Sequence, residues 1–231
     1  MKNRAAKQYE GLIGAALSDK GRIAAAVVGW EKQNGRSFPW RADRTPYRVL
    51  ISEVLLKRTT STAAARAFIE FSKKYPDMRS LALASQGALE GIISKVGLQA
   101  QRSKALLEMS SHICERLNGE IPQAYDRLME IPGIGSYTAA AVMSFGFGTP
   151  AAVVDSNVTR VFSRAFNGKG GVLPLSVVTA IANGVLPQVS HVEFNYGLLD
   201  IGAIVCRYGR PECAQCPLCS LCNYAGARTY P

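Results

Sequence analysis

The segment Leu128-Met-Glu-Ile-Pro-Gly-Ile-Gly-Ser-Tyr-Thr-Ala-Ala-Ala-Val142 decides the fold of this chain. Its apolar spacing predicts a helix, a tight Pro-Gly-Ile-Gly turn and a second helix. Gly133 and Gly135 permit positive φ angles and place no side chain between the backbone amides and an incoming group. The start of a helix presents unpaired N–H donors and the positive end of its dipole, so the turn predicts an anion site. An ordinary helix–helix turn is the alternative.

Helical spacing also dominates the rest of the sequence, and no segment alternates convincingly like a strand. Glycine and proline interrupt the pattern, for example at Pro76 and in the stretch 167–171. The sequence therefore predicts an all-α protein without internal repeats or a low-complexity linker. The expected helices are 23–33, 47–59, 61–75, 81–84, 88–96, 101–117, 124–130, 137–145, 157–166 and 175–185.

The composition is that of a folded protein with a basic surface. Hydrophobic residues make up 48% and charged residues 19% of the 231 residues, unlike a disordered chain. Lysine and arginine number 27 against 17 acidic residues, giving a net charge of +10, which favours a polyanionic partner such as nucleic acid or an anionic membrane surface. Simple solubility is the alternative explanation of this charge.

Two features of the sequence indicate the compartment. No apolar run approaches the roughly 18 to 20 residues of a spanning helix, and the first residues lack a signal-peptide cleavage pattern. Four of the six cysteines crowd between Cys213 and Cys222, which suits a metal better than a disulfide framework. We therefore expect a cytoplasmic protein, associated with the nucleoid if the source is prokaryotic, with no membrane partner.

The hairpin and the segment that follows it closely resemble the hairpin and catalytic segment of the endonuclease III and MutY superfamily of DNA glycosylases. The second segment reads Val153-Val-Asp-Ser-Asn-Val-Thr-Arg-Val-Phe-Ser-Arg164, and the resemblance covers roughly residues 30 to 225. It implies the helix-hairpin-helix DNA glycosylase fold, with a six-helix barrel domain at 44–149 and a 4Fe-4S cluster domain formed by 1–43 and 150–231. It also implies double-stranded DNA across the cleft between the domains, with one base flipped out.

Asp155 follows an apolar run and precedes a helix, so by itself it is a good N-cap. A carboxylate there is also held ionised by the helix dipole and by amide hydrogen bonds. Glycosidic cleavage builds positive charge on the sugar, and a fixed anion stabilises that charge and orients the attacking water. The resemblance gives Asp155 this catalytic role and makes Asn157 a helper that positions the sugar or the water. A plain turn asparagine is the alternative for Asn157.

Tyr137 stands where bifunctional members of the family carry a lysine that attacks the sugar and forms a Schiff base. A phenol cannot form an imine. The resemblance therefore implies a monofunctional enzyme that leaves an abasic site without cutting the strand, and a downstream abasic-site endonuclease as a partner. A tyrosine that merely packs against the hairpin is the alternative.

The segment Ile51-Ser-Glu-Val-Leu-Leu-Lys-Arg-Thr-Thr-Ser61 predicts an apolar helix with a basic and hydroxylic end. A half-buried Glu53 would have a raised pKa and could donate a proton or hydrogen-bond a flipped base, whereas a glutamate on the wet face of its helix would do neither. The resemblance makes this the base-pocket helix. Leu56-Lys-Arg-Thr-Thr60 looks like the LLRRTT run of archaeal-type thymine-DNA mismatch glycosylases, in which case Lys57 or Arg58 enters the gap left by the base or contacts the opposing guanine.

Two further segments also match the family. Phe38-Pro-Trp-Arg41 corresponds to a stretch that joins the amino-terminal arm to the body. The segment 96–102 resembles a second DNA-facing turn, although a glycine-capped helix end explains it almost as well.

Cys206, Cys213, Cys216 and Cys222 have the spacing C-x6-C-x2-C-x5-C, which suits a tetrahedral metal or a cubane cluster. A structural zinc is the generic alternative, and the resemblance favours the 4Fe-4S cluster of this family. Cys219 is an extra cysteine that we expect to be a bystander, and Cys114 is expected in the core. Arg207 and Arg210 lie in the first interval, where a loop fixed by a cluster could bring them to DNA phosphates.

Three functions compete at this point. The run 57–60 favours a monomeric glycosylase that acts on thymine or uracil mispaired with guanine. Removal of adenine opposite 8-oxoguanine or guanine is the alternative; the helix around Glu53 and Asn157 favour it, but the sequence after Cys222 is too short for the additional domain with which such enzymes read the damaged guanine. A non-catalytic iron–sulfur DNA-binding protein is the third, and the presence of both Glu53 and Asp155 speaks against it.

Overall fold

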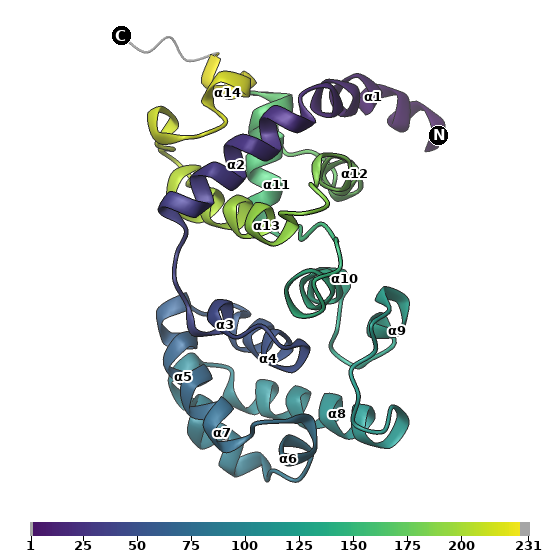
Figure 1. Ribbon diagram of the computed structural model, residues 1–231, viewed down its shortest axis with the longest axis vertical. Coiled ribbons are helices and arrows are strands. Elements are labelled where there is room, and N and C mark those ends of the chain that lie inside the picture. The colour runs from purple at the N-terminus through teal and green to yellow at the C-terminus, as the bar shows by residue number, and fades with distance from the viewer. Residues whose placement is uncertain (1, 227–231) are drawn as a thin grey trace. The chain divides into compact units, whose positions relative to one another are not determined.

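The computed structural model describes residues 2–226, and every regular element in that range is a helix (Figure 1). The predicted all-α class is therefore confirmed. No helix in this part of the chain is long and apolar enough to cross a membrane. The contacts divide the chain into two compact units, one formed by Met1–Arg36 with Pro150–Pro231 and the other by Ser37–Thr149. The domain assignment at 44–149 and at 1–43 with 150–231 stays a prediction.

The unit Ser37–Thr149, called the barrel unit below, is built from short helices around an apolar core. Large side chains such as Leu50, Phe68, Phe71 and Leu106 are fully buried in it. Hydroxyl and carboxyl N-caps begin several of the helices, as at Thr45 before the fourth. In order the elements are α3 (Pro39–Ala42), α4 (Pro46–Leu56), α5 (Ser61–Lys74), α6 (Met78–Ala82), α7 (Gln86–Ile93), η1 (Ser94–Val96), α8 (Gln99–Arg116), α9 (Tyr125–Met129), α10 (Ser136–Ala141) and the π turn η2 (Val142–Gly146).

The second unit, called the cysteine unit below, joins the two ends of the chain in one core. Val27 from the N-terminal arm packs in the same apolar cluster as Phe162, Ile181 and Phe194. Its elements are α1 (Lys2–Ser18), α2 (Lys20–Asn34), α11 (Ser156–Asn167), α12 (Leu175–Val185), α13 (His191–Asp200), the π turn η3 (Ile201–Val205), η4 (Cys213–Gln215), η5 (Cys219–Leu221) and α14 (Asn223–Gly226).

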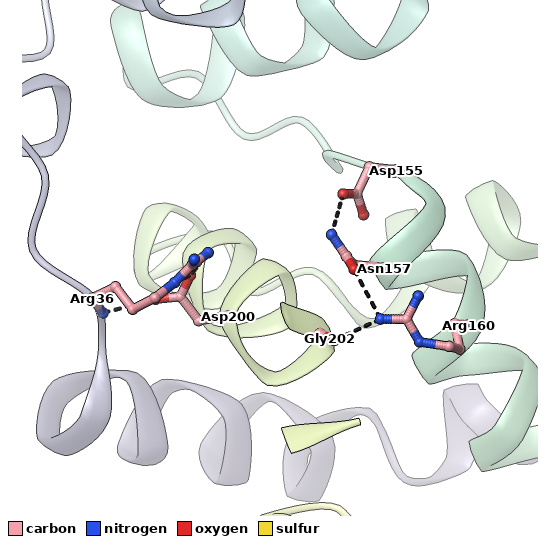
Figure 2. Close-up of polar contacts among 6 residues, drawn as sticks. All are labelled: Arg36, Asp155, Asn157, Arg160, Asp200 and Gly202. Atoms are coloured by element: carbon pink, nitrogen blue, oxygen red, sulfur yellow. Dashed lines mark hydrogen bonds and ion pairs between the residues drawn. The ribbon is translucent and has the colours of Figure 1, made fainter. Parts of the chain in front are cut away.

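A buried ion pair fixes the end of the N-terminal arm. Asp200 has no exposed side-chain surface, and it accepts from the Arg36 backbone N–H at 2.8 Å and from Arg36 Nε at 2.8 Å (Figure 2). Because a buried carboxylate is costly unless it is paired and hydrogen-bonded, this contact holds α2 against α13 at the point where the arm leaves the unit.

The helices expected from the sequence do not include α1, α13 and the two four-residue helices α3 and α14. Helix α13 buries the polar side chains His191, Asn195 and Asp200 among its apolar ones, so its hydrophobic periodicity is broken. Helix α1 contains Gly11 and Gly14, which weaken the helical signal. The helix expected at 47–59 was too long, because α4 ends at Leu56 and Arg58 adopts a left-handed φ of 55°.

Candidate active site

The hairpin forms as the sequence predicts and leaves open space before its turn. Ile131 and Ile134 are buried and anchor the turn, whose backbone closes through a bond from Ile134 N–H to Ile131 O at 3.1 Å. Gly133 has φ 82°, a conformation that favours glycine, and a Cβ added to Gly133 or Gly135 would meet no atom within 4 Å. No side chain caps the start of α10. The first amides of α10 therefore face a space that an anion can enter.

Helix α10 packs closely through its alanines. Ala139, Ala140 and Ala141 are buried, as is Thr138. Tyr137, one turn from the glycines, is partly exposed. Its phenol is therefore neither wholly in the core nor wholly in solvent, a position compatible with packing on the hairpin and with contact to a ligand.

Glu53 is buried in α4, with 8% of its surface exposed. Ser52, Val54 and Leu55 around it are buried as well. The alternative that Glu53 lies on the wet face of its helix is therefore wrong. Sequence reasoning expected a half-buried side chain, and the structure places Glu53 deeper than that.

The turn after α4 brings the basic residues next to the hairpin. Lys57 and Arg58 are exposed, and Lys57 Nζ donates to the carbonyl oxygen of Gly133 at 3.2 Å. A cavity of about 260 Å³ lies within the barrel unit beneath these residues. It is lined by Leu50, Val54, Lys57, Arg58, Leu98, Gln101, Arg102, Ala105, Met109, Pro132, Gly133, Ile134 and Thr138. The structure thus brings together Lys57, Arg58 and Gly133, three DNA contacts expected from separate segments of the sequence.

Asp155 is the N-cap of α11, in the cysteine unit (Figure 2). Its Oδ1 accepts from the Val158 backbone N–H at 2.8 Å, and its Oδ2 accepts from Asn157 Nδ2 at 2.7 Å. The cap interpretation is confirmed, and it is compatible with a catalytic role because both contacts fix the direction of the carboxylate. Asn157 is more than a turn residue, since its amide lies against the acid.

Arg160, which sequence reasoning missed, extends this chain of contacts from Asn157 to Gly202 (Figure 2). Arg160 is buried, with 7% of its surface exposed, and its guanidinium donates to Asn157 Oδ1 at 2.8 Å and to Gly202 O at 2.5 Å. It also donates to the carbonyl of Cys206 at 2.7 Å. The ring of Tyr208 covers it, 4.1 Å from the guanidinium carbon. One buried cation therefore connects the partner of Asp155 to the first cysteine of the motif.

The four motif cysteines line one small cavity together with Cys219 and Arg164. Burial raises the pKa of the Cys216 thiol to about 12, with contributions from Cys206, Cys222 and Cys213, and burial likewise raises the pKa of Cys222. Among residues 2–226, no three His, Cys, Asp or Glu side chains come together as ligands of one metal ion would. Cys219 borders the same cavity, so its position does not separate it from the other four.

Arg164 was also missed and contacts the motif directly. Its Nη1 lies 3.3 Å from Cys206 Sγ and donates to Arg207 O at 2.8 Å. Both arginines could have been predicted from the sequence, because residues three and four positions apart share one helix face. This spacing places Arg160 and Arg164 on the same face as Asn157.

The remaining expected residues lie at the surface or in other contacts. Arg207 pairs with Glu212 within the cysteine loop, and Arg210 is exposed. Cys114, expected in the core, is only partly buried on α8, and its thiol lies 3.7 Å from Met78 O. Trp40 of the 38–41 segment packs edge-on against Phe68 at 5.7 Å within the barrel unit.

Comparison with known proteins gives a consistent result. Residues 51–176 match the family described as HhH-GPD superfamily base excision DNA repair protein. A thymine/uracil-DNA glycosylase of Methanothermobacter thermautotrophicus is 35% identical over 87% of this chain and 92% of its own length. The adenine DNA glycosylase of Homo sapiens is 32% identical over 86% of this chain but 38% of its own length. The solved structure of a thermostable thymine-DNA glycosylase superposes with a TM-score of 0.86 at 30% identity, covering 91% of this chain and 98% of that one.

Proposed function

This chain belongs to the HhH-GPD superfamily of base excision DNA repair proteins and is a DNA N-glycosylase, and we propose that it removes thymine or uracil mispaired with guanine. The observation that carries the proposal is the position of the turn 57–60. Lys57 contacts the hairpin glycine and Arg58 is exposed beside it. An exposed arginine at a phosphate-binding hairpin can reach the O6 and N7 acceptors of a guanine left without its partner. The thymine/uracil-DNA glycosylase that matches this chain over 92% of its own length supports the same substrate.

The proposed chemistry uses Asp155 as a fixed anion. As the glycosidic bond breaks, positive charge develops on the sugar, and the carboxylate stabilises it and orients the attacking water. Asn157 keeps Oδ2 of the acid in place through the 2.7 Å contact. Buried Glu53 binds the extruded base by accepting a hydrogen bond from its N3–H. It does not protonate the base, since thymine and uracil leave as anions. Tyr137 offers no amine, so no Schiff base forms and the DNA strand stays intact.

We also propose that Cys206, Cys213, Cys216 and Cys222 hold a 4Fe-4S cluster. The thiols line one cavity, and a metal bound there would hold them as thiolates, the form of cysteine that ligates metals. The sequence spacing C-x6-C-x2-C-x5-C, which resembles that of the cluster loop of this family, supports a cluster over a structural zinc. When bound, it would tie residues 206–222 into one rigid loop.

Single-turnover assays on end-labelled duplexes test the substrate. Duplexes with G:T, G:U or 8-oxoguanine:A are incubated with the protein, with and without alkali. We expect alkali-dependent cuts at T and U, no cuts without alkali and no borohydride-trapped adduct. Cuts at adenine alone would establish the alternative that the human adenine DNA glycosylase represents, and no cut at any duplex would overturn both.

Asp155→Asn tests the proposed role of the acid with little change of shape. We expect the rate to fall by about 10³-fold while duplex binding persists, because an electrostatic contact of this kind contributes several kcal/mol to the barrier. Asp77→Asn is the matched control, since Asp77 is also an N-cap aspartate and lies in the other unit. A rate that is unchanged by Asp155→Asn would exclude the proposed role.

Iron and sulfide analysis with visible absorbance tests the cluster independently of activity. We expect about four irons per chain in protein purified without oxygen, and loss of the visible band in Cys213→Ser. Cys114→Ser, away from the motif, is the control, and Cys219→Ser should retain iron. Stoichiometric zinc without iron would overturn the cluster assignment.

A further inference from the structure

Arg102 is buried on α8 with 5% of its surface exposed, and the proposed chemistry does not use it. Its guanidinium donates to six oxygen atoms, all of them uncharged. Nε donates to Gly97 O at 2.8 Å, and Nη1 donates to Val54 O at 2.6 Å and Leu55 O at 2.7 Å. Nη2 donates to Lys57 O, to Thr59 Oγ1 at 2.5 Å and to Val96 O at 3.3 Å. A buried cation is tolerated when its donors are occupied in this way.

The acceptors belong to two turns that are far apart in the sequence. Four lie at the end of α4 and in the turn 57–60, and the other two lie in the turn 96–98. The last carbonyls of a helix have no intrahelical donor and carry its negative dipole end, so Arg102 caps α4 while binding the second turn. A direct bond between the turns, from Thr59 Oγ1 to Val96 O at 2.8 Å, closes the arrangement. We call residues 57–60 and 96–98 together the two-turn surface.

Each turn contains a residue in the left-handed region. Arg58 has φ 55° and Leu98 has φ 53°, and among the described residues the other non-glycine case is Asn118. Asparagine adopts this region readily, whereas arginine and leucine do so at a cost. Such conformations persist when surrounding contacts enforce them, and here the enforcing contacts come from Arg102 on both sides.

The side chains presented by these residues point to a ligand. Lys57, Arg58 and Leu98 are exposed, Leu98 by 41%, and all three line the cavity beside Gly133. Cations next to an exposed apolar side chain suit a duplex in which a base pair is opened, because the cations meet phosphate or guanine and the apolar group meets unstacked bases.

We propose that Arg102 is a positioning residue for mismatch recognition: by holding the two-turn surface rigid, it presents Arg58 and Leu98 to the opened base pair. The proposal rests on the proposed function. Because the two turns are already ordered in the free protein, less conformational entropy is lost when they bind DNA. This increases the affinity only for complexes in which the turns contact the DNA. Binding to fully paired DNA, which the hairpin amides and surface cations provide, depends on it much less.

Arg102→Lys is the decisive variant, because lysine keeps the charge but lacks the planar fork that reaches both turns. Binding is measured in an Asp155→Asn background, which blocks turnover, to G:T and to fully paired G:C duplexes. We expect affinity for G:T to fall about tenfold and affinity for G:C to change less than twofold. The fluorescence of 2-aminopurine rises when its neighbouring bases unstack. With 2-aminopurine placed beside the mismatched thymine, we expect the fluorescence to rise less on binding of the Arg102→Lys protein than on binding of the protein that retains Arg102. Arg66→Lys on α5, whose arginine is exposed, is the matched control and should change neither value.

Equal losses on both duplexes, or unchanged discrimination in a folded Arg102→Lys protein, would refute the positioning role. If Arg102→Lys does not fold, Thr59→Val keeps the side-chain shape but removes the hydroxyl that accepts from Arg102 and donates to Val96 O. We expect this variant to lose more affinity for G:T than for G:C duplexes. Full discrimination by a folded Thr59→Val protein would then count against the proposal. Cleavage of G:T and G:U duplexes by the wild-type protein distinguishes failure of this proposal from failure of the proposed function. If the wild type does not cleave them, the proposed function is wrong. If the wild type cleaves them but the variants keep full discrimination, only the role of Arg102 is wrong.

Discussion

Arg102 in the barrel unit and Arg160 in the cysteine unit are the arginines that the described chain buries, at 5% and 7% exposure. Both direct their guanidinium at backbone carbonyls. Their remaining contacts differ, because Arg160 reaches the side chain of Asn157 and through it Asp155, whereas Arg102 reaches a threonine hydroxyl and the backbone of two turns. A buried arginine thus contacts the proposed catalytic acid through Asn157 in one unit and holds the proposed recognition surface in the other. We expect loss of Arg160 to lower the rate of base removal and loss of Arg102 to lower mismatch discrimination.

Arg160→Gln tests the first half of this contrast and has the largest expected effect among the variants that address it. It removes the Arg160 donor from the carbonyl of Gly202, leaves the carbonyl of Cys206 with only the longer 3.4 Å contact to Arg164 Nη1, and frees Asn157 to turn away from the acid. We expect unfolding of the cysteine unit to become easier by about 3 kcal/mol, and the single-turnover rate per folded molecule to fall about 100-fold, the effect of a misplacement near 1 Å.

Urea unfolding and single-turnover rates at saturating protein measure these two effects. Duplex affinity should change little, in contrast to Arg102→Lys. An Arg160→Gln protein with a normal rate per folded molecule would remove the distinction between the two arginines.

Gly202→Ala tests the same contact without touching a charge. A Cβ at Gly202 would lie 2.5 Å from Asn157 Cβ and 3.1 Å from its backbone, so Asn157 must shift. We expect a loss of about 1–3 kcal/mol in unfolding free energy, as for other overpacked sites, and a roughly tenfold slower base removal.

Gly29→Ala is the control for this prediction, because a Cβ at Gly29 in α2 meets nothing within 4 Å. It should be neutral or stabilising by about 0.5–1 kcal/mol, since alanine favours the helix. If both alanine variants remove the base at the same rate, the position of Asn157 does not control the chemistry.

Substitutions of the hairpin glycines Gly133 and Gly135 test a binding contact in the barrel unit that does not involve Arg102. Gly133→Ala is strained because φ is 82°, whereas Gly135 has φ −104° and accepts a side chain. Both additions point into open space where we expect a phosphate. Both variants should therefore bind G:C and G:T duplexes several-fold more weakly by similar factors, and Gly133→Ala alone should lose about 1 kcal/mol of stability. Filter binding and thermal unfolding measure the two effects, and normal affinity of Gly135→Ala would argue against a phosphate at this turn.

Local residue patterns predicted the parts of the site that lie close together in the sequence. The hairpin glycines, the Asp155 cap and the cysteine loop each occupy a short segment, and their local geometry follows from known propensities. The contacts that Arg102 makes across more than forty residues were not predictable, because a buried arginine looks like any other basic residue in a helical pattern. Helix α13 was not predicted for a similar reason: its buried Asp200 is stabilised by Arg36, which lies 164 residues away in the sequence.

Asp77→Ala has the smallest expected effect, and it separates stability from recognition in the barrel unit. Asp77 is the exposed N-cap of α6, and the amide hydrogen bond from Ser80, 2.8 Å from Oδ1, holds the pKa of Asp77 below its usual 3.8. Because the folded pKa is lowered, the cap stabilises the protein fully above the unfolded pKa and loses that contribution as the pH falls through the folded value. We expect Asp77→Ala to cost about 1 kcal/mol at pH 7, and the difference from wild type to vanish in acid as the wild-type carboxyl becomes protonated.

Urea titrations at pH 7 and at decreasing pH values below 3.8 measure this difference. G:T discrimination by Asp77→Ala should equal that of wild type, since the two-turn surface keeps all of its contacts. If discrimination falls with this cap as it does in Arg102→Lys, then recognition follows the overall stability of the barrel unit, and Arg102 has no particular part in it.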